Sequence, residues 1–254
     1  MSHPKNNPIQ QLFRYLAAWV FMCVYWPSVL SFHLLTFKQM PDSWLQTVIR
    51  FWGRSIFRIL GIRIHHINPS TVETTEARVV ICNHQSTLDL PWGGTICPPR
   101  PVTIGKKEVI YIPILNLIFW VLDFIRVDRG NTQKALASLE GVAEQIKAGK
   151  KSLVIAPEGT RSPTGQVLPF KKGAFHIAVQ AQVPIHPVVV HGAFECLPKN
   201  RWLPRRGDIY IQFLEPISTL GKSAADVPAL TLQAENLVRE GLTTLRARFP
   251  IRLD

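Results

Sequence analysis

The segment best suited to chemistry is residues 83–89 (NHQSTLD), which directly follow the β-branched run RVVIC at 78–82. That run predicts a strand, and the Ser-Thr pair after it predicts a capped helix start, so His84 should be exposed at a sheet edge. Asp89 should lie about one turn into the helix and reach back to Nδ1 of His84. It would fix the tautomer and leave Nε2 as a base for a hydroxyl near neutral pH. The pattern favours general-base catalysis, although by itself it is also typical of a histidine that only closes a strand.

A second polar segment, residues 155–162 (IAPEGTRS), ends another β-branched run. Ligands of α/β sheets bind at the carboxyl ends of strands, so this segment is placed to contact one. Gly159 permits a tight turn with exposed N–H groups, and the planar guanidinium of Arg161 suits bidentate contact with a phosphate. The alternative is a salt bridge between Glu158 and Arg161 that only stabilises the turn.

Two cations follow this segment. Lys171 and Lys172 precede Gly173 at the predicted start of a helix, where the positive end of the helix dipole also favours an anion. No GxxxxGK[ST] sequence occurs, so a P-loop is excluded. The remaining histidines have no regular ligand spacing with a carboxylate, so no metal site is predicted.

The elements that must position these residues begin with a hydrophobic N-terminus. Residues 15–37 contain no Asp, Glu, Lys or Arg, and the run is close to the ~20 residues needed to cross a hydrocarbon core. Because Pro27 and His33 lie within it, a kinked or re-entrant pair of helices fits as well as one straight span. A signal peptide is disfavoured, since the run is long, aromatic-rich and not followed by a small-residue cleavage site.

The next two apolar segments also predict helices. In residues 43–62, Arg50, Arg54 and Arg58 are four apart and share one helical face. A cationic face beside Trp and Phe is typical of an interfacial helix on anionic lipid, and the alternative is a core helix with solvated arginines. Residues 109–121 are too few to span a bilayer and predict a buried or membrane-facing helix.

The rest of the chain alternates strands and helices. Strands are predicted at 78–82, 152–156, 185–190 and 208–214, and helices at 131–150 and 230–249. The predicted fold class is therefore α/β, a mixed β-sheet flanked by helices, with an N-terminal hydrophobic helical membrane module. Residues 1–62 would form the membrane-embedded or interfacial module and residues 63–254 the α/β catalytic domain, with the seam at 63–76.

Composition points to a membrane partner. The 254 residues carry a net charge of +12, are 46% hydrophobic and have a mean hydropathy of +0.10. These values exclude disorder and disfavour a soluble nucleic-acid binder, and they indicate an anionic phospholipid surface. The basic, Trp-containing patch at 199–206 favours lipid head groups over nucleic acid, with a solvated loop as the alternative. The four cysteines are scattered, which argues against a disulfide scaffold or a zinc ribbon and favours a reducing compartment.

Four ordered blocks give the chain a family resemblance. They are NHQSTLD, the stretch DFIRVDR at 123–129, PEGTRS and VPIHPV, together spanning roughly residues 82–190. The series resembles the glycerolipid acyltransferases, most of all the 1-acylglycerol-3-phosphate (lysophosphatidic acid) acyltransferases. Two positions depart from the family pattern. Asp123 stands where the family usually has Gly and adds a negative charge near a phosphate site, and His186 occupies a normally apolar position.

The resemblance implies roles for the matched residues. His84 would be the general base and Asp89 would orient it. The residues implied to hold the glycerol-phosphate part of the acceptor are Arg129, Glu158, Gly159, Thr160 and Arg161, to which the two cations Lys171 and Lys172 are added. The residues implied to contact the acyl chain are Pro184, Ile185 and Pro187. The family transfers an acyl group from acyl-CoA or acyl-carrier protein directly to the sn-2 hydroxyl of lysophosphatidic acid, giving phosphatidic acid, with no metal or other cofactor.

The expected location is the inner (cytoplasmic) membrane, with the catalytic domain on the cytoplasmic face. Other functions stay open: an acyltransferase for another lysophospholipid or a lyso-aminolipid, a thioesterase or phospholipase, or a non-catalytic lipid-binding protein of the same fold. A covalent acyl-enzyme is disfavoured, because Cys82 closes a buried strand and Ser86 is suited to capping the following helix.

Overall fold

The computed structural model describes residues 7–36, 41–69, 76–98, 100–106, 108, 111–122, 124–127, 132–149 and 151–251. Its strands form one seven-stranded sheet in the order β1-β7-β6-β2-β5-β3-β4. They are β1 (Ile62–Ile67), β2 (Val79–Cys82), β3 (Pro101–Lys106), β4 (Ile125–Val127), β5 (Ser152–Ile155), β6 (Ile185–His191) and β7 (Gly207–Phe213). Neighbouring strands run parallel except β6 and β7, which are antiparallel. The predicted mixed sheet is confirmed.

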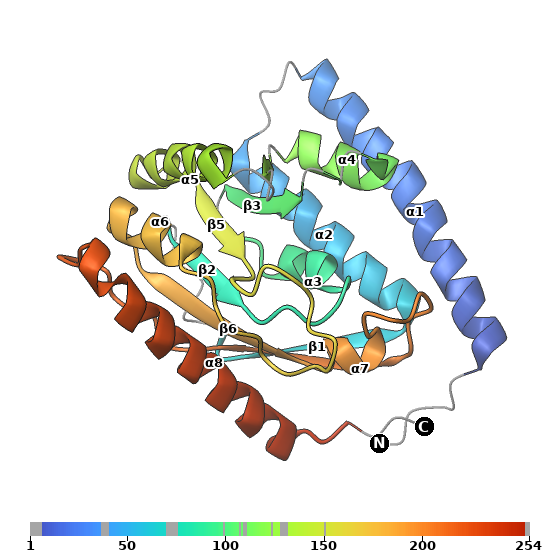
Figure 1. Ribbon diagram of the computed structural model, residues 1–254. Coiled ribbons are helices and arrows are strands. Elements are labelled where there is room, and N and C mark those ends of the chain that lie inside the picture. Colours follow the sequence, from blue (N-terminus) through green and yellow to red (C-terminus); the bar gives the residue numbers. More distant parts are fainter. Residues whose placement is uncertain are drawn as a thin grey trace.

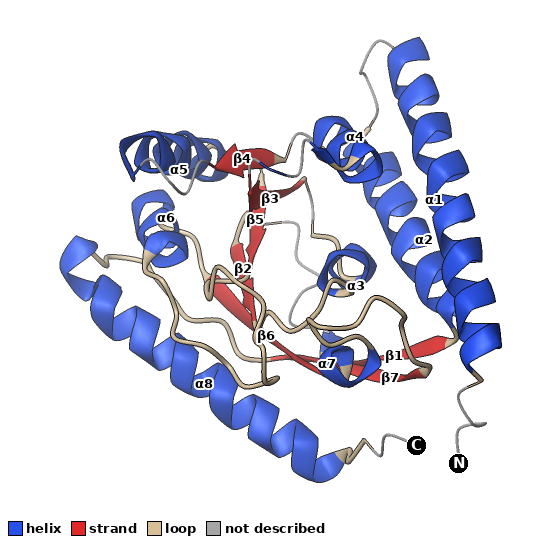
Figure 2. Cartoon of the chain, turned by 45° about the vertical axis from the view of Figure 1, so that its right-hand side comes forward, coloured by secondary structure: helices blue, strands red, loops and turns tan. Residues whose placement is uncertain are grey.

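Helices cover both faces of this sheet (Figures 1 and 2). One face carries α5 (Thr132–Lys147), α6 (Gly173–Ala181) and α8 (Val227–Arg248), the last entered through the short helix η3 (Ala224–Asp226). The other face carries α1 (Pro8–Leu35), α2 (Asp42–Leu60), α3 (Asp89–Thr95), α4 (Pro113–Val121) and α7 (Ala193–Cys196). Successive side chains of a strand point to opposite faces, so Val79 and Ile81 of β2 pack under α6 and α8, whereas Val80 and Cys82 pack under α2 and α3.

The four strands predicted from β-branched runs are all present. β2 and β6 lie in the centre of the sheet and are buried along their whole length, which explains their continuous apolar sequences. The sequence did not reveal β1, β3 or β4. β1 occupies the start of the predicted seam at 63–76, and as an edge strand it exposes Arg63, His65 and His66, which hides its apolar alternation.

The hydrophobic N-terminal segment forms a single helix. α1 runs without a break from Pro8 to Leu35 and includes Pro27. The segment is therefore one helix and not a re-entrant pair of helices. By length and composition α1 is able to cross a membrane, and only 17% of its most apolar stretch is buried against the rest of the protein. The low buried share distinguishes α1 from an ordinary core helix.

α2 turns its apolar face to the core. Trp52 packs against Trp26 of α1, with ring centroids 5.4 Å apart, and both are buried. The arginines Arg50, Arg54 and Arg58 lie on the exposed side. The apolar face of α2 therefore belongs to the protein interior, as the core-helix alternative expects, and lipid contact by the arginines stays a prediction.

The N-terminal helices and the sheet share one apolar cluster. It joins α1 and α2 to β2, β6 and β7 without a gap at residue 62. The predicted parts at residues 1–62 and 63–254 therefore share one hydrophobic core. That residues 1–62 contact the membrane stays a prediction.

Candidate active site

His84 and Asp89 meet at the carboxyl end of β2, as their spacing predicts. Nδ1 of His84 lies 2.6 Å from Oδ2 of Asp89. The same oxygen accepts the backbone N–H groups of Gln85 (2.9 Å) and Ser86 (3.1 Å), and Oδ1 accepts the Nε1–H of Trp92 (2.9 Å). Asp89 is the first residue of α3 and not one turn inside it, so its carboxylate collects donors from the turn before the helix. With Nδ1 occupied, Nε2 is the ring nitrogen that remains for a substrate.

Cys82 and Ser86 are both engaged by other groups. Cys82 is buried, its Sγ donates to the carbonyl of Ile155 (3.8 Å), and burial raises the pKa of the thiol well above its ordinary value. Ser86 is fully buried, donates to the carbonyl of Leu197 (2.8 Å) and accepts the N–H of Leu88 (3.1 Å). The N-cap of α3 is Leu88, so the prediction that Ser86 caps this helix is wrong. These environments argue against either side chain as a nucleophile.

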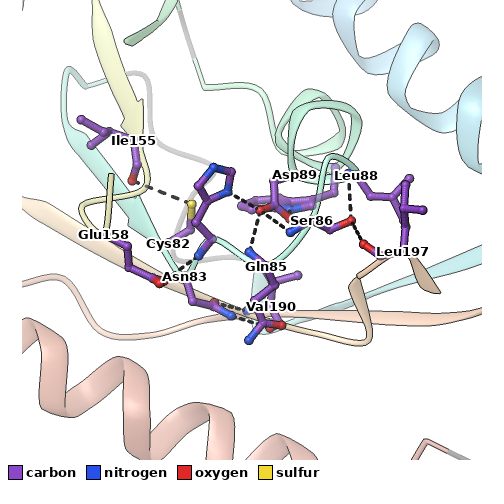
Figure 3. A network of polar contacts seen from close by, with 12 residues as sticks. Cys82, Asn83, Gln85, Ser86, Leu88, Asp89, Ile155, Glu158, Val190 and Leu197 are labelled. Atoms are coloured by element: carbon purple, nitrogen blue, oxygen red, sulfur yellow. Dashed lines mark hydrogen bonds and ion pairs between the residues drawn. The ribbon is translucent and has the colours of Figure 1, made fainter. Parts of the chain in front are cut away.

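Glu158 connects the second polar segment to His84 (Figure 3). Its Oε1 accepts the backbone N–H of His84 (2.7 Å), and its Oε2 accepts that of Leu168 (3.0 Å). The residue is only 3% exposed, and burial raises the pKa of its carboxyl to about 7. Because both oxygens bind backbone amides, the alternative of a Glu158–Arg161 salt bridge is not realised in the described structure.

A cavity of about 630 Å³ opens beside His84. Its walls come from the carboxyl ends of β2 and β5, from β3, α3 and α4, and from the start of α6. The lining residues are Cys82, His84, Asp89, Leu90, Trp92, Thr103, Ile104, Phe119, Val154, Ile155, Ala156, Pro157, Gly159, Lys171, Gly173 and Ala174. A second cavity of about 80 Å³ shares Asp89, Leu90, Thr103 and Val154 with the first and extends toward α2. The main cavity has the size of a typical small-molecule site, roughly 300–1,000 Å³.

The cavity includes some of the predicted phosphate-binding residues. Gly159 and Lys171 line it, and a Cβ on Gly159 would lie 3.0 Å from Nζ of Lys171. Gly159 also has a φ of +71°, so glycine both permits the turn and leaves room for the ammonium group. Four other predicted acceptor-binding residues do not line the cavity: Glu158, Thr160, Arg161 and Lys172. The burial of Glu158 argues against its predicted contact with the acceptor, and that contact stays a prediction. Arg129 and Asp123 lie outside the described residues.

The residues expected to contact the acyl chain lie away from this cavity. Ile185 begins β6 and pairs with Val79 at the amino end of β2, whereas the cavity is at the carboxyl end. Pro184 and Pro187 lie on either side of Ile185, and none of the three lines the cavity, so the cavity does not support their predicted acyl contact, which stays a prediction. His186, the departure from the family pattern, is buried in the same strand, and burial lowers the pKa of its imidazole to about 4.

Sequence reasoning missed the backbone contacts that hold the His84 segment. The N–H of Ser162 donates to the carbonyl of His84 (2.8 Å), and the side-chain amide of Asn83 bonds both the N–H and the C=O of Val190 (each 2.8 Å). A polar Asn at the end of a fully buried strand is the one signal that could have suggested this. The cavity wall was also missed, because residues such as Phe119 have the same pattern as ordinary core residues.

Glu158 should give the protein a distinctive pH dependence of stability. Its folded pKa of about 7 exceeds the ordinary 4.5, so the folded state holds a proton that the unfolded state has lost between those values. The free energy of unfolding should therefore fall as pH rises from about 4.5 to about 7, by at most ~3 kcal/mol. Glu158→Gln removes this contribution. The melting temperature of the variant relative to that of the wild type should therefore be higher at pH 8 than at pH 5. An identical pH dependence in both proteins would contradict this prediction.

Comparison with known proteins agrees with the fold and with the family resemblance. A family model described as Acyltransferase matches residues 63–191. The 1-acyl-sn-glycerol-3-phosphate acyltransferase of Haemophilus influenzae is 31% identical over 235 residues, which are 92% of this chain and 95% of that protein. The human 1-acyl-sn-glycerol-3-phosphate acyltransferase alpha is 36% identical over 206 residues, 78% of this chain and 69% of that protein.

A solved structure has the same fold. The 1-acyl-sn-glycerophosphate (LPA) acyltransferase PlsC of Thermotoga maritima superposes with a TM-score of 0.79 at 27% identity, covering 94% of this chain and 98% of that one. The α/β sheet with a histidine–carboxylate pair at its carboxyl edge is thus the scaffold of an enzyme that transfers acyl groups. The chain belongs to the acyltransferase family.

Proposed function

We propose that the protein transfers a fatty acyl group from an acyl thioester, either acyl-CoA or acyl-carrier protein, to the sn-2 hydroxyl of lysophosphatidic acid, giving phosphatidic acid. The observation that carries this proposal is the His84–Asp89 pair in the wall of a large cavity that also holds the Lys171 ammonium group. The names of the relatives support lysophosphatidic acid as the acceptor.

In this mechanism Nε2 of His84 takes the proton of the acceptor hydroxyl while the oxygen attacks the thioester carbon. The new C–O bond forms, the C–S bond breaks, and the proton passes from the imidazolium to the departing thiolate. Asp89 stabilises the imidazolium through Nδ1 and keeps the ring in one orientation. No metal or cofactor other than the acyl thioester takes part in these steps.

Lys171 and the start of α6 are proposed to hold the acceptor's phosphate. The ammonium group lies beside the Gly159 turn, and Gly173, the first residue of α6, lines the same cavity. A helix start presents N–H groups without intrahelical partners and a positive dipole end, both of which attract an anion. The apolar wall that includes Leu90, Ile104 and Phe119 suits the acyl chain.

Anionic phospholipid is the proposed membrane partner, and the cytoplasmic face of the inner membrane the proposed location. The largely exposed apolar surface of α1 supports this proposal. α1 meets α4 where His33 packs against Trp120, and the neighbouring Phe119 lines the cavity. A lipid acceptor would therefore have a short path from the bilayer to the site.

The test offers purified protein in anionic liposomes a panel of acceptors with labelled acyl-CoA and acyl-carrier protein. The panel contains lysophosphatidic acid, lysophosphatidylglycerol, lysophosphatidylethanolamine and water alone. The expected result is labelled phosphatidic acid from at least one donor. Labelled free fatty acid alone would indicate a thioesterase, preference for another lysolipid would change the acceptor, and no product from any combination would reject the proposed function.

Lys171→Met should weaken acceptor binding. A hydrogen bond to a charged group contributes about 1.5–3 kcal/mol, so the KM for lysophosphatidic acid should rise about tenfold or more, with kcat within about threefold. Lys172→Met is the matched control, because this neighbouring exposed lysine does not line the cavity. Equal effects of both substitutions would point to general surface charge and count against a specific phosphate contact.

A further inference from the structure

The backbone of His84 is held from both sides by the second polar segment. Oε1 of Glu158 accepts its N–H (2.7 Å), and the N–H of Ser162 donates to its carbonyl (2.8 Å). His84 lies after the end of β2 and before α3, so no strand or helix partner fixes this peptide. Asp89 orients the imidazole ring, whereas residues 158–162 fix the main chain from which the ring projects.

The second oxygen of Glu158 closes the loop that carries the cations. Oε2 accepts the N–H of Leu168 (3.0 Å), ten residues along the chain. The N–H of Lys171 in turn donates to the carbonyl of Pro157 (2.9 Å). One carboxylate thus connects the backbone of the His84 segment to the loop that ends at the Lys171 side chain.

The surroundings of Glu158 separate it from any substrate. The residue is 3% exposed and does not line the cavity, although its neighbours Pro157 and Gly159 do. Both oxygens of the carboxylate are already bonded to backbone amides, and its burial leaves no exposed face for the hydroxyls of a glycerol group.

We propose that Glu158 is a positioning residue that sets the place of His84 relative to the Lys171 loop and does not bind the acceptor. The inference rests on the proposed function, because it assigns a role within that reaction. Its consequence is that loss of the carboxylate lowers the rate of the chemical step. Acceptor affinity is kept, because the backbone of Lys171 is held separately by the carbonyl of Pro157.

Two substitutions test this from different sides. Glu158→Gln keeps the length of the side chain but turns one of its two acceptors into a donor that faces an N–H group. Glu158→Asp keeps the charge but is one carbon too short to reach both amides. Because displacement of a catalytic group by about 1 Å costs on the order of a hundredfold in rate, each variant should lose roughly 30–300-fold in kcat. The KM for lysophosphatidic acid should stay within about threefold.

Glu235→Gln is the matched control. Glu235 of α8 also accepts a backbone N–H of this loop, that of Phe170 (2.8 Å), but does not contact His84. This variant should keep kcat within about threefold, which separates loss of the His84 contact from general loosening of the loop.

The wild-type protein is assayed first, and a thermal unfolding curve shows whether each variant is folded. A wild type that acylates no lysolipid rejects the proposed function, whatever Glu158 does. With an active wild type, an unchanged kcat in folded Glu158 variants overturns the positioning role. A tenfold or larger rise in KM with kcat recovered at saturation overturns it in favour of substrate binding. Failure of both variants to fold assigns the carboxylate to stability and also overturns the proposal.

Discussion

His84→Ala should abolish measurable acyl transfer, with kcat reduced by about a thousandfold or more. General-base catalysis contributes on the order of 10²–10⁴, and no other base among the described cavity residues is oriented by a carboxylate as His84 is. Lipid binding should survive, because the other cavity-lining residues, including Lys171, are untouched. Transfer of labelled acyl groups to lysophosphatidic acid, with binding to anionic liposomes measured in parallel, checks both expectations.

The matched control is His176→Ala. His176 is exposed on α6 and does not line the cavity, so its replacement should leave the rate within about threefold. Full activity of His84→Ala would refute the mechanism. An acyl group trapped on the His84→Ala protein would instead indicate a covalent route through Cys82 or Ser86, which the buried positions of both side chains argue against.

Asp89→Asn should have the second largest effect, a fall in kcat of about a hundredfold to a thousandfold. The carboxylate oxygen accepts the proton on Nδ1 of His84, whereas an amide placed there can present an N–H that favours the opposite tautomer. Nε2 would then carry the proton and could not act as a base. The loss should appear in kcat, since Asp89 contacts the ring of His84 and three donors of its own segment.

An exposed acidic residue provides the comparison. Asp42 at the start of α2 pairs with Arg100 and has no contact with the cavity, so Asp42→Asn should leave the rate unchanged within about threefold. If Asp89→Asn kept wild-type kcat with an unaltered pH profile, the carboxylate would have only a structural role at the start of α3. Unfolding curves recorded on each variant separate loss of catalysis from loss of fold.

Two segments about seventy residues apart act as one unit because their strands are neighbours. β2 and β5 are parallel and adjacent, so the turns after Cys82 and after Ile155 emerge side by side at one edge of the sheet. This proximity allows Glu158 and Ser162 to bind the backbone of His84. The buried polar groups of both turns are then satisfied by each other, which a turn in isolation could not achieve.

Much of the fold could be predicted because its signals are local. The central strands are continuous apolar runs, and α2, α5 and α8 have apolar residues at helical intervals. Residues close together in the chain therefore predict which faces of these elements are buried. The edge strand β1 was missed, since only Ile62 among its side chains is fully buried. The path of the chain through Pro27 was also undecided, because a proline within an apolar run is compatible with a break or with one helix.

The sequence by itself determined the central strands, the contact between His84 and Asp89, and the family resemblance. His84 and Asp89 could be paired because five residues across a strand-to-helix turn bring their side chains together regardless of the rest of the fold. Only the tertiary structure decided what Glu158 contacts, that Lys171 and not Arg161 lines the cavity, and that Pro184 lies beyond its reach. These outcomes depend on strand order and on which helices cover the sheet edge. They arise from contacts between residues far apart in the chain, and no local spacing encodes them.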